Sequence, residues 1–301
     1  MKQAGANVAQ VPLEAARRPS SASDFVALTK PRLNLLVVLT SAAGYYLGST
    51  TPVSLLAMAP SVCGTALVAG GAAVLNQVYE RQTDALMRRT RLRPLPDGRV
   101  GSSEAAAFGI VLSAAGLALL TLFANGVAAL LALATLVVYL VVYTPMKRRS
   151  SAATLVGAVP GALPPLIGWA ASHGSVTTGG WTLFGIVFLW QIPHFMAIAW
   201  MYRDDYRSAG FPMLPVVEPD GRRTGRQALI YAAALLPVSL APAFTGVSGW
   251  IYFGVALALG AALLVLAARF AATRSETAAR WLFFGSITYL PLIWAAMVLD
   301  H

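Results

Sequence analysis

Asn76, Glu80 and Asp84 recur at four-residue intervals directly after a long apolar run that ends near Leu75. If the helix of that run continues to residue 84, each four-residue step turns it by roughly 400°, so the three side chains spread over only about 80° of one face. One amide and two carboxylates would then line up at a membrane edge. Burial of ionisable groups within a membrane is energetically unfavourable, and such groups are therefore candidates for function.

A second polar constellation follows a later apolar run. It begins Trp-Gln-Ile-Pro-His194-Phe and continues through Tyr-Arg-Asp-Asp-Tyr at residues 202–206. Counted from the N-terminus, these two runs are the second and the sixth apolar stretch, so they end on the same membrane face. Their acidic residues can therefore converge on one site. His194 precedes Asp204 by ten residues, which is about 15 Å along a helix. It fits either a hydrogen-bonded core residue or a substrate contact.

Carboxylate and amide oxygens are hard ligands, and Mg²⁺ typically takes one or two carboxylates together with substrate phosphates. Arginines and lysines on the same membrane face indicate a phosphate ligand that the metal bridges. The predicted catalytic residues, which are also the predicted metal ligands, are Asn76, Glu80, Asp84, Asp204 and Asp205. The predicted substrate-binding residues are Arg81, Arg93, Tyr143, Lys147, Arg148, His194, Tyr202 and Tyr206.

Some of these residues also fit a purely structural role. The segment from Tyr143 to Arg149 is typical of an aromatic belt followed by a positive anchor. Lys30 and Arg32, at the start of the first span, fit either anchoring at the headgroups or contact with a substrate phosphate.

The elements that must position these residues are membrane spans, because 57% of the 301 residues are hydrophobic and only 11% are charged. A soluble domain has roughly 25% charged residues. Nine apolar stretches approach the roughly 20 residues that cross a bilayer. They cover about 26–48, 54–78, 104–124, 127–145, 152–171, 181–201, 227–245, 249–268 and 281–299.

The pattern predicts an all-α polytopic membrane protein with nine transmembrane helices around a central cavity. Residues 25–301 form a single transmembrane domain in this interpretation, and residues 1–24 form a disordered cytoplasmic tail. The Gly- and Pro-rich run at 156–169 predicts a bent or broken span that lines the interior. Cys63 is the only cysteine, which excludes a disulfide framework and a thiolate metal cluster.

The positive charges predict the orientation of the chain. All 22 lysines and arginines fall in the N-terminal segment and in the connections after spans two, four, six and eight. Cytoplasmic loops carry the positive excess, so the N-terminus is predicted to be cytoplasmic and the C-terminus outside. The membrane topology therefore explains the net charge of +10 without a nucleic-acid partner. The short, partly acidic N-terminus favours a bacterial plasma membrane, with the active site on its cytoplasmic side.

Several motifs resemble the UbiA-type intramembrane prenyltransferases and, within them, the branch that acts on heme. The superfamily pattern NxxxDxxxD is matched by Asn76, Glu80 and Asp84, with Glu at the middle position. More specific are Tyr143-Thr-Pro-Met-Lys-Arg, Trp190-Gln-Ile-Pro-His-Phe, and the stretches 156–169 and 209–215. The resemblance covers residues 25 to about 300 and is strongest from 76 to 216.

The chain departs from the family pattern at three places. Gln82 stands where relatives often carry Asp, and Ala153 stands where Asn is expected. The second superfamily motif is commonly DxxxD, whereas here two tyrosines bracket two adjacent aspartates, so either Asp204 or Asp205 could reach the metal.

This resemblance implies transfer of a farnesyl group from farnesyl diphosphate to a vinyl group of heme B, which gives heme O. It also implies Mg²⁺ as cofactor, and a heme A synthase as a downstream partner. An alternative within the family is transfer to an aromatic acid or quinone precursor. A secondary transporter is the alternative from another class, but transporters bind near the midplane, whereas both acidic clusters here lie at helix ends.

Overall fold

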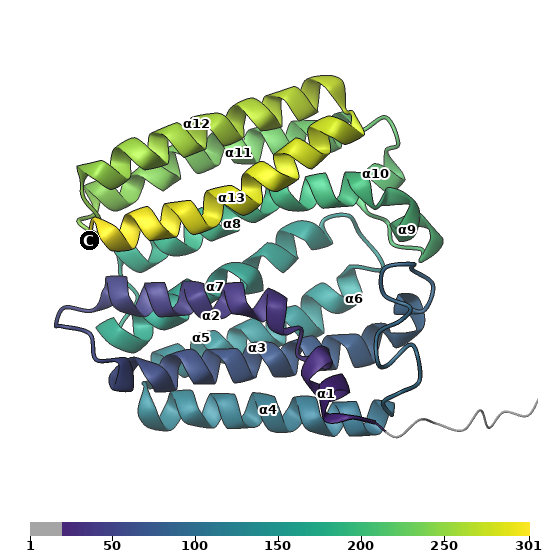
Figure 1. Ribbon diagram of the computed structural model, residues 1–301, viewed down its shortest axis with the longest axis horizontal. Coiled ribbons are helices and arrows are strands. Elements are labelled where there is room, and N and C mark those ends of the chain that lie inside the picture. The colour runs from purple at the N-terminus through teal and green to yellow at the C-terminus, as the bar shows by residue number, and fades with distance from the viewer. Residues whose placement is uncertain (1–19) are drawn as a thin grey trace, which may run out of the picture.

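The computed structural model describes residues 20–301, and all the regular secondary structure in this part of the chain is helical (Figure 1). The long helices are α2 (Pro31–Gly48), α3 (Leu55–Asp84), α4 (Ser102–Phe123), α5 (Gly126–Val137), α7 (Ala153–His173), α8 (Thr178–Met201), α11 (Arg222–Phe244), α12 (Trp250–Thr273) and α13 (Glu276–Leu299). The short ones are α1 (Ala22–Leu28), the π-helix η1 (Val138–Tyr143), α6 (Thr144–Met146), α9 (Arg203–Ser208) and α10 (Leu214–Val217).

Eight helical segments are long and apolar enough to cross a membrane, and α5, η1 and α6 together make one of them, residues 126–146. A ninth is counted if α1 and α2, which meet at 54°, form one bent span. The predicted all-α polytopic fold is therefore confirmed. The helix α3 continues to Asp84, as the spacing of the Asn76 motif required.

The helices form two groups that meet along α7 and α8 (Figure 1). The largest buried apolar cluster joins α8 to α11, α12 and α13, and a second one joins α5 to α7. The span over the Gly- and Pro-rich run is not broken, because α7 is a continuous helix with three prolines inside it, but it lies in the interior as predicted, since most of it is buried. Gly44 and Gly168 let the backbones of α2 and α7 touch, so neighbouring protein, rather than lipid, surrounds the carbonyl groups that lack an N–H partner because of the prolines.

The connections that carry lysine and arginine lie at one end of the bundle. In Figure 1, residues 85–101 and the segment that contains α9 and α10 lie at the right, as does α1, whereas the C-terminus lies at the left. This common end brings the two polar constellations of the sequence to the same side of the molecule.

The N-terminal tail was predicted to reach residue 24, but α1 already begins at Ala22. Ser21 caps this helix and forms a capping box with Asp24. Gln77 of α3 donates to the carbonyl oxygen of Leu28 at 2.6 Å, which ties the end of α1 to the helix of the motif. Residues 1–19 of the predicted tail lie outside the described part of the chain.

Candidate active site

The three motif side chains of α3 are buried, with exposed fractions of 3% for Asn76, 3% for Glu80 and 1% for Asp84. Burial of a carboxylate is unfavourable unless a partner compensates its charge. Each of the two carboxylates has a cationic partner, and Asn76 has a hydrogen-bond partner, from another segment. We call the resulting arrangement the ladder.

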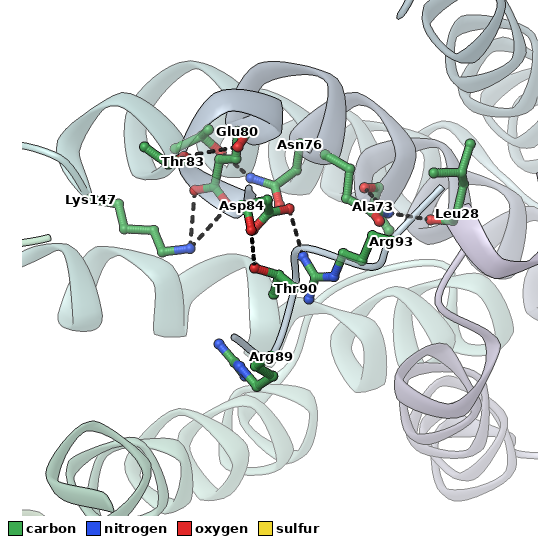
Figure 2. Close-up of polar contacts among 12 residues, drawn as sticks. Leu28, Ala73, Asn76, Glu80, Thr83, Asp84, Arg89, Thr90, Arg93 and Lys147 are labelled. Carbon is green, nitrogen blue, oxygen red and sulfur yellow. Dashed lines mark hydrogen bonds and ion pairs between the residues drawn. The ribbon is translucent and has the colours of Figure 1, made fainter. Parts of the chain in front are cut away.

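The ladder has three rungs. Figure 2 labels both residues of the second and third rungs and Asn76 of the first. Asn76 Nδ2 donates to Thr144 Oγ1 (3.1 Å), Lys147 Nζ donates to both carboxylate oxygens of Glu80 (3.0 and 3.1 Å), and Arg93 donates to Asp84 Oδ2 (2.8 Å). Thr90 Oγ1 also donates to the backbone carbonyl of Asp84 at 2.7 Å and so fixes the connection after α3.

The first two rungs follow from helix geometry. Residues three or four apart lie on the same face of a helix, and this holds both for Asn76 and Glu80 on α3 and for Thr144 and Lys147 at the end of the 126–146 span. These two spans run in the same direction through the bundle. The two faces therefore pair in register.

The electrostatics of the ladder favour an anionic ligand. Burial opposes the charge of Lys147, but the Glu80 carboxylate at 3.0 Å outweighs it, so the pKa of its ammonium group is held above its ordinary value. Lys147 also lies 4.9 Å from the ring centroid of Phe211.

Lys30, in the bend between α1 and α2, adds a further positive charge. Its φ of 51° is in the left-handed region, which is uncommon for a residue other than glycine. With Lys147 and Arg93, it makes three positive residues for the two carboxylates of this region.

Of the predicted substrate-binding residues, Arg93 and Lys147 are rungs of the ladder, and the others lie outside it. Arg81 points to another side of α3, where it donates to Ser102 Oγ at 3.1 Å and lines a separate cavity of about 610 Å³. Arg148 is exposed next to Lys147. Tyr143 is half-buried, and its ring packs on Gly157 of α7.

The second constellation lines a cavity of about 430 Å³ together with Arg88 and Arg89. Tyr202, Asp204 and Asp205 contribute to its wall. The Asp204 side chain is 79% exposed and pairs with Arg207 at 2.8 Å, whereas Asp205 is half-buried. The side chain of Asp205 forms no ion pair with any residue from 20 to 301.

Arg89 connects the two constellations. Its guanidinium donates to Tyr206 Oη at 3.4 Å and lies 5.4 Å from the ring centroid of Tyr202. An apolar cluster of Met87, Tyr206, Ala209 and Phe211 packs beside it. Sequence reasoning missed Arg89 because nothing in an arginine-rich loop distinguishes one arginine from its neighbours.

His194 lies away from the ladder, between α8 and α13. Its ring stacks between Trp190 and Phe283, with centroid distances of 5.0 and 5.1 Å, and Nδ1 is 2.8 Å from Ser286 Oγ. Ser286 donates its only hydroxyl proton to the carbonyl of Phe283. Nδ1 must therefore carry the proton and donate it. The lone pair of Nε2 accepts no hydrogen bond from residues 20–301.

The donor atoms of the ladder fit a magnesium ion in chemical type, since they are carboxylate and amide oxygens. Asp84 Oδ1 and Asn76 Oδ1 accept no hydrogen bond from the described residues. No group of three Asp, Glu, His or Cys side chains within residues 20–301 is close enough to hold a metal alone. Such a group is not required, because Mg²⁺ usually takes one or two carboxylates and completes its shell with substrate phosphates and water.

The fold and the ladder define an intramembrane prenyltransferase. Residues 37–288 match the UbiA prenyltransferase family, and the chain belongs to that family. It is an integral membrane protein and an enzyme of the prenyltransferase class.

Two similar curated proteins are both named protoheme IX farnesyltransferase. The one from Solibacter usitatus is 48% identical over 287 residues, covering 92% of this chain and 98% of that protein. The one from Opitutus terrae is 48% identical over 281 residues, covering 93% and 95%.

Solved structures share the fold. A structure described as digeranylgeranylglyceryl phosphate synthase in membranes has a TM-score of 0.79 at 16% identity, covering 92% of this chain and 97% of that chain. A UbiA homologue from Archaeoglobus fulgidus bound to GPP and Mg²⁺ has a TM-score of 0.66 at 17% identity, covering 91% and 99%.

Proposed function

We propose that this enzyme transfers the farnesyl group of farnesyl diphosphate to a vinyl group of heme B and so makes heme O. Two relatives named protoheme IX farnesyltransferase, each 48% identical over more than 90% of the chain, support the substrates. The observation that carries the chemistry is the ladder, in which buried carboxylates and cations lie in pairs.

Glu80, Asp84 and the side-chain oxygen of Asn76 would hold Mg²⁺, and a UbiA homologue from Archaeoglobus fulgidus is bound to GPP and Mg²⁺, which supports this choice of metal. The bound ion supplies positive charge to the diphosphate leaving group. Lys147 and Arg93 turn from their carboxylates to the phosphate oxygens, where charge-assisted hydrogen bonds form. Of the two aspartates in the second constellation, we favour Asp205 as the one that reaches this ligand, because it is half-buried whereas the Asp204 side chain is 79% exposed.

The bond changes require no amino-acid nucleophile. The C–O bond of farnesyl diphosphate breaks, and its electron pair leaves with the diphosphate. The vinyl π electrons of heme form the new C–C bond to the allylic carbon. Water then adds to the cation left on the porphyrin side and loses a proton, which gives the hydroxyethylfarnesyl group.

We further propose that the reaction takes place on the cytoplasmic side of a bacterial plasma membrane, and that heme O passes to a heme A synthase. The positive connections at one end of the bundle support this orientation.

His194 is proposed to contact or orient heme through its free Nε2. Purified His194→Ala should then bind heme more weakly, with a changed Soret band and unchanged affinity for farnesyl diphosphate. An unaltered Soret titration combined with lower thermal stability would assign His194 to the core.

The function is tested by incubating membranes that contain the protein with heme B, farnesyl diphosphate and Mg²⁺, followed by heme extraction and chromatography. A new, more hydrophobic heme with the mass of heme O is expected, and membranes containing Asp84→Asn should lack it. If no heme product forms but an aromatic acid acceptor becomes prenylated, the proposed acceptor is wrong.

A further inference from the structure

We propose that Thr144 is a positioning residue that aims the side-chain oxygen of Asn76 at the metal position. This inference rests on the proposed function, in which Asn76 is a ligand of Mg²⁺. Thr144 was not among the residues predicted from sequence, although it lies three residues before Lys147 and therefore on the same helix face.

The hydrogen bonds of Thr144 determine which end of the Asn76 amide faces it. A threonine hydroxyl has one proton, and Thr144 lies 2.7 Å from the carbonyl oxygen of Tyr139, which can only accept. The hydroxyl proton is therefore used there, and the hydroxyl oxygen must accept from Asn76 at 3.1 Å. The NH₂ group of Asn76 consequently faces Thr144.

The opposite orientation of Asn76 would place two acceptors against each other. Thr144 is fully buried and Asn76 is 3% exposed, so water is not at hand to relieve such a contact. The carbonyl oxygen of the amide is thereby turned away from Thr144. It accepts no hydrogen bond from residues 20–301, and a hard oxygen without a donor is suited to a cation.

The π-helix η1 brings Thr144 to this position. The backbone N–H of Thr144 reaches the carbonyl of Tyr139, five residues earlier, and the hydroxyl shares the same acceptor. The following Pro145 has no N–H and its ring would clash with the carbonyl four residues before it in a regular α-helix. The wide turn relieves that clash, and single π-turns inside helices are frequent at functional sites.

The test compares Thr144→Val, which removes the hydroxyl at nearly equal volume, with Thr144→Ser, which keeps it. Mn²⁺ serves as a spectroscopic substitute for Mg²⁺, and its binding is followed by electron paramagnetic resonance in the presence of a non-hydrolysable farnesyl thiodiphosphate. Loss of a residue that orients a metal ligand typically lowers metal affinity by 10- to 100-fold. We expect about a tenfold or larger loss in Thr144→Val and a change below about twofold in Thr144→Ser.

Thr135→Val is the matched control, because Thr135 lies in the same span and donates to a backbone carbonyl at 2.8 Å without touching the motif. It should leave Mn²⁺ affinity unchanged. In an Asn76→Ala background, Thr144→Val should cause no additional loss, since residues that act through one another are not additive.

Wild-type Mn²⁺ affinity in Thr144→Val would overturn the inference, and so would full additivity with Asn76→Ala. If Thr144→Val does not fold, Thr144→Ala in the same two backgrounds decides the question. A wild-type protein that binds no Mn²⁺ with the analogue would instead contradict the proposed function.

Discussion

At the scale of single residues, the site is built from buried charges that compensate one another. Removing one partner of a buried pair leaves the other uncompensated, which is strongly unfavourable. The rungs of the ladder therefore hold their side chains in fixed positions before any ligand arrives. This arrangement gives clear expectations for each rung.

Neutralising a carboxylate of the ladder should stop turnover. Glu80→Gln and Asp84→Asn each remove charge from a proposed metal ligand, and we expect a loss of about 4 kcal/mol of transition-state stabilisation, roughly a thousandfold in rate. The measurement is heme O formation by purified variants that remain monodisperse. Glu276→Gln is the control, because that carboxylate is exposed and pairs only with Arg280. Near-parental activity of Asp84→Asn would disprove the metal assignment.

The cations of the ladder should affect one substrate selectively. Lys147→Met and Arg93→Met are expected to weaken binding of farnesyl diphosphate by about tenfold or more, because each removes a charge-assisted contact to phosphate. Heme binding should stay nearly unchanged in a Soret titration. Arg148→Met provides the comparison, since Arg148 is exposed and outside the ladder. Equal losses for both substrates would indicate misfolding.

At the scale of elements, Arg89 joins the loop after α3 to the segment around α9. We expect Arg89→Ala to increase hydrogen exchange of the backbone amides in residues 202–211, since it removes the contacts of the loop with Tyr202 and Tyr206 and leaves the apolar cluster around Met87. Arg88→Ala is the matched control, because Arg88 lines the same cavity without a contact to either tyrosine. Equal exchange in both variants would show that Arg89 does not link the two segments.

Local patterns predicted α3 and the motif face correctly because the spacing of Asn76, Glu80 and Asp84 is a property of a single helix. The same geometry argues against Arg81 as a site residue, because one residue beyond Glu80 turns the helix by about 100°. The rungs depend on which spans become neighbours, and single-sequence patterns do not contain that information. The continuity of α7 likewise depends on packing with α2, which the prolines alone do not disclose.

At the scale of the whole molecule, the predicted sidedness can be measured directly. In a background with Cys63→Ser, a cysteine at Ser208 should react with a membrane-impermeant maleimide only in inverted vesicles. A cysteine at Ser49, at the opposite end of the bundle, should react only in right-side-out vesicles. The reverse pattern would show that the charged connections lie outside and that the active site opens to the other compartment.

The pairing within the ladder also has a thermodynamic consequence for how ligands enter. A metal ion bound alone by Glu80 would displace Lys147 and leave the ammonium group without a counter-charge. A diphosphate bound alone by Lys147 would likewise leave the Glu80 carboxylate without a counter-charge. Only simultaneous binding leaves every group compensated, so each ligand must raise the affinity for the other by the same factor. Calorimetric titration of the thiodiphosphate analogue with and without Mg²⁺ measures this factor. Equal affinity for the analogue with and without Mg²⁺ would mean that the ion pairs of the ladder stay intact when either ligand binds.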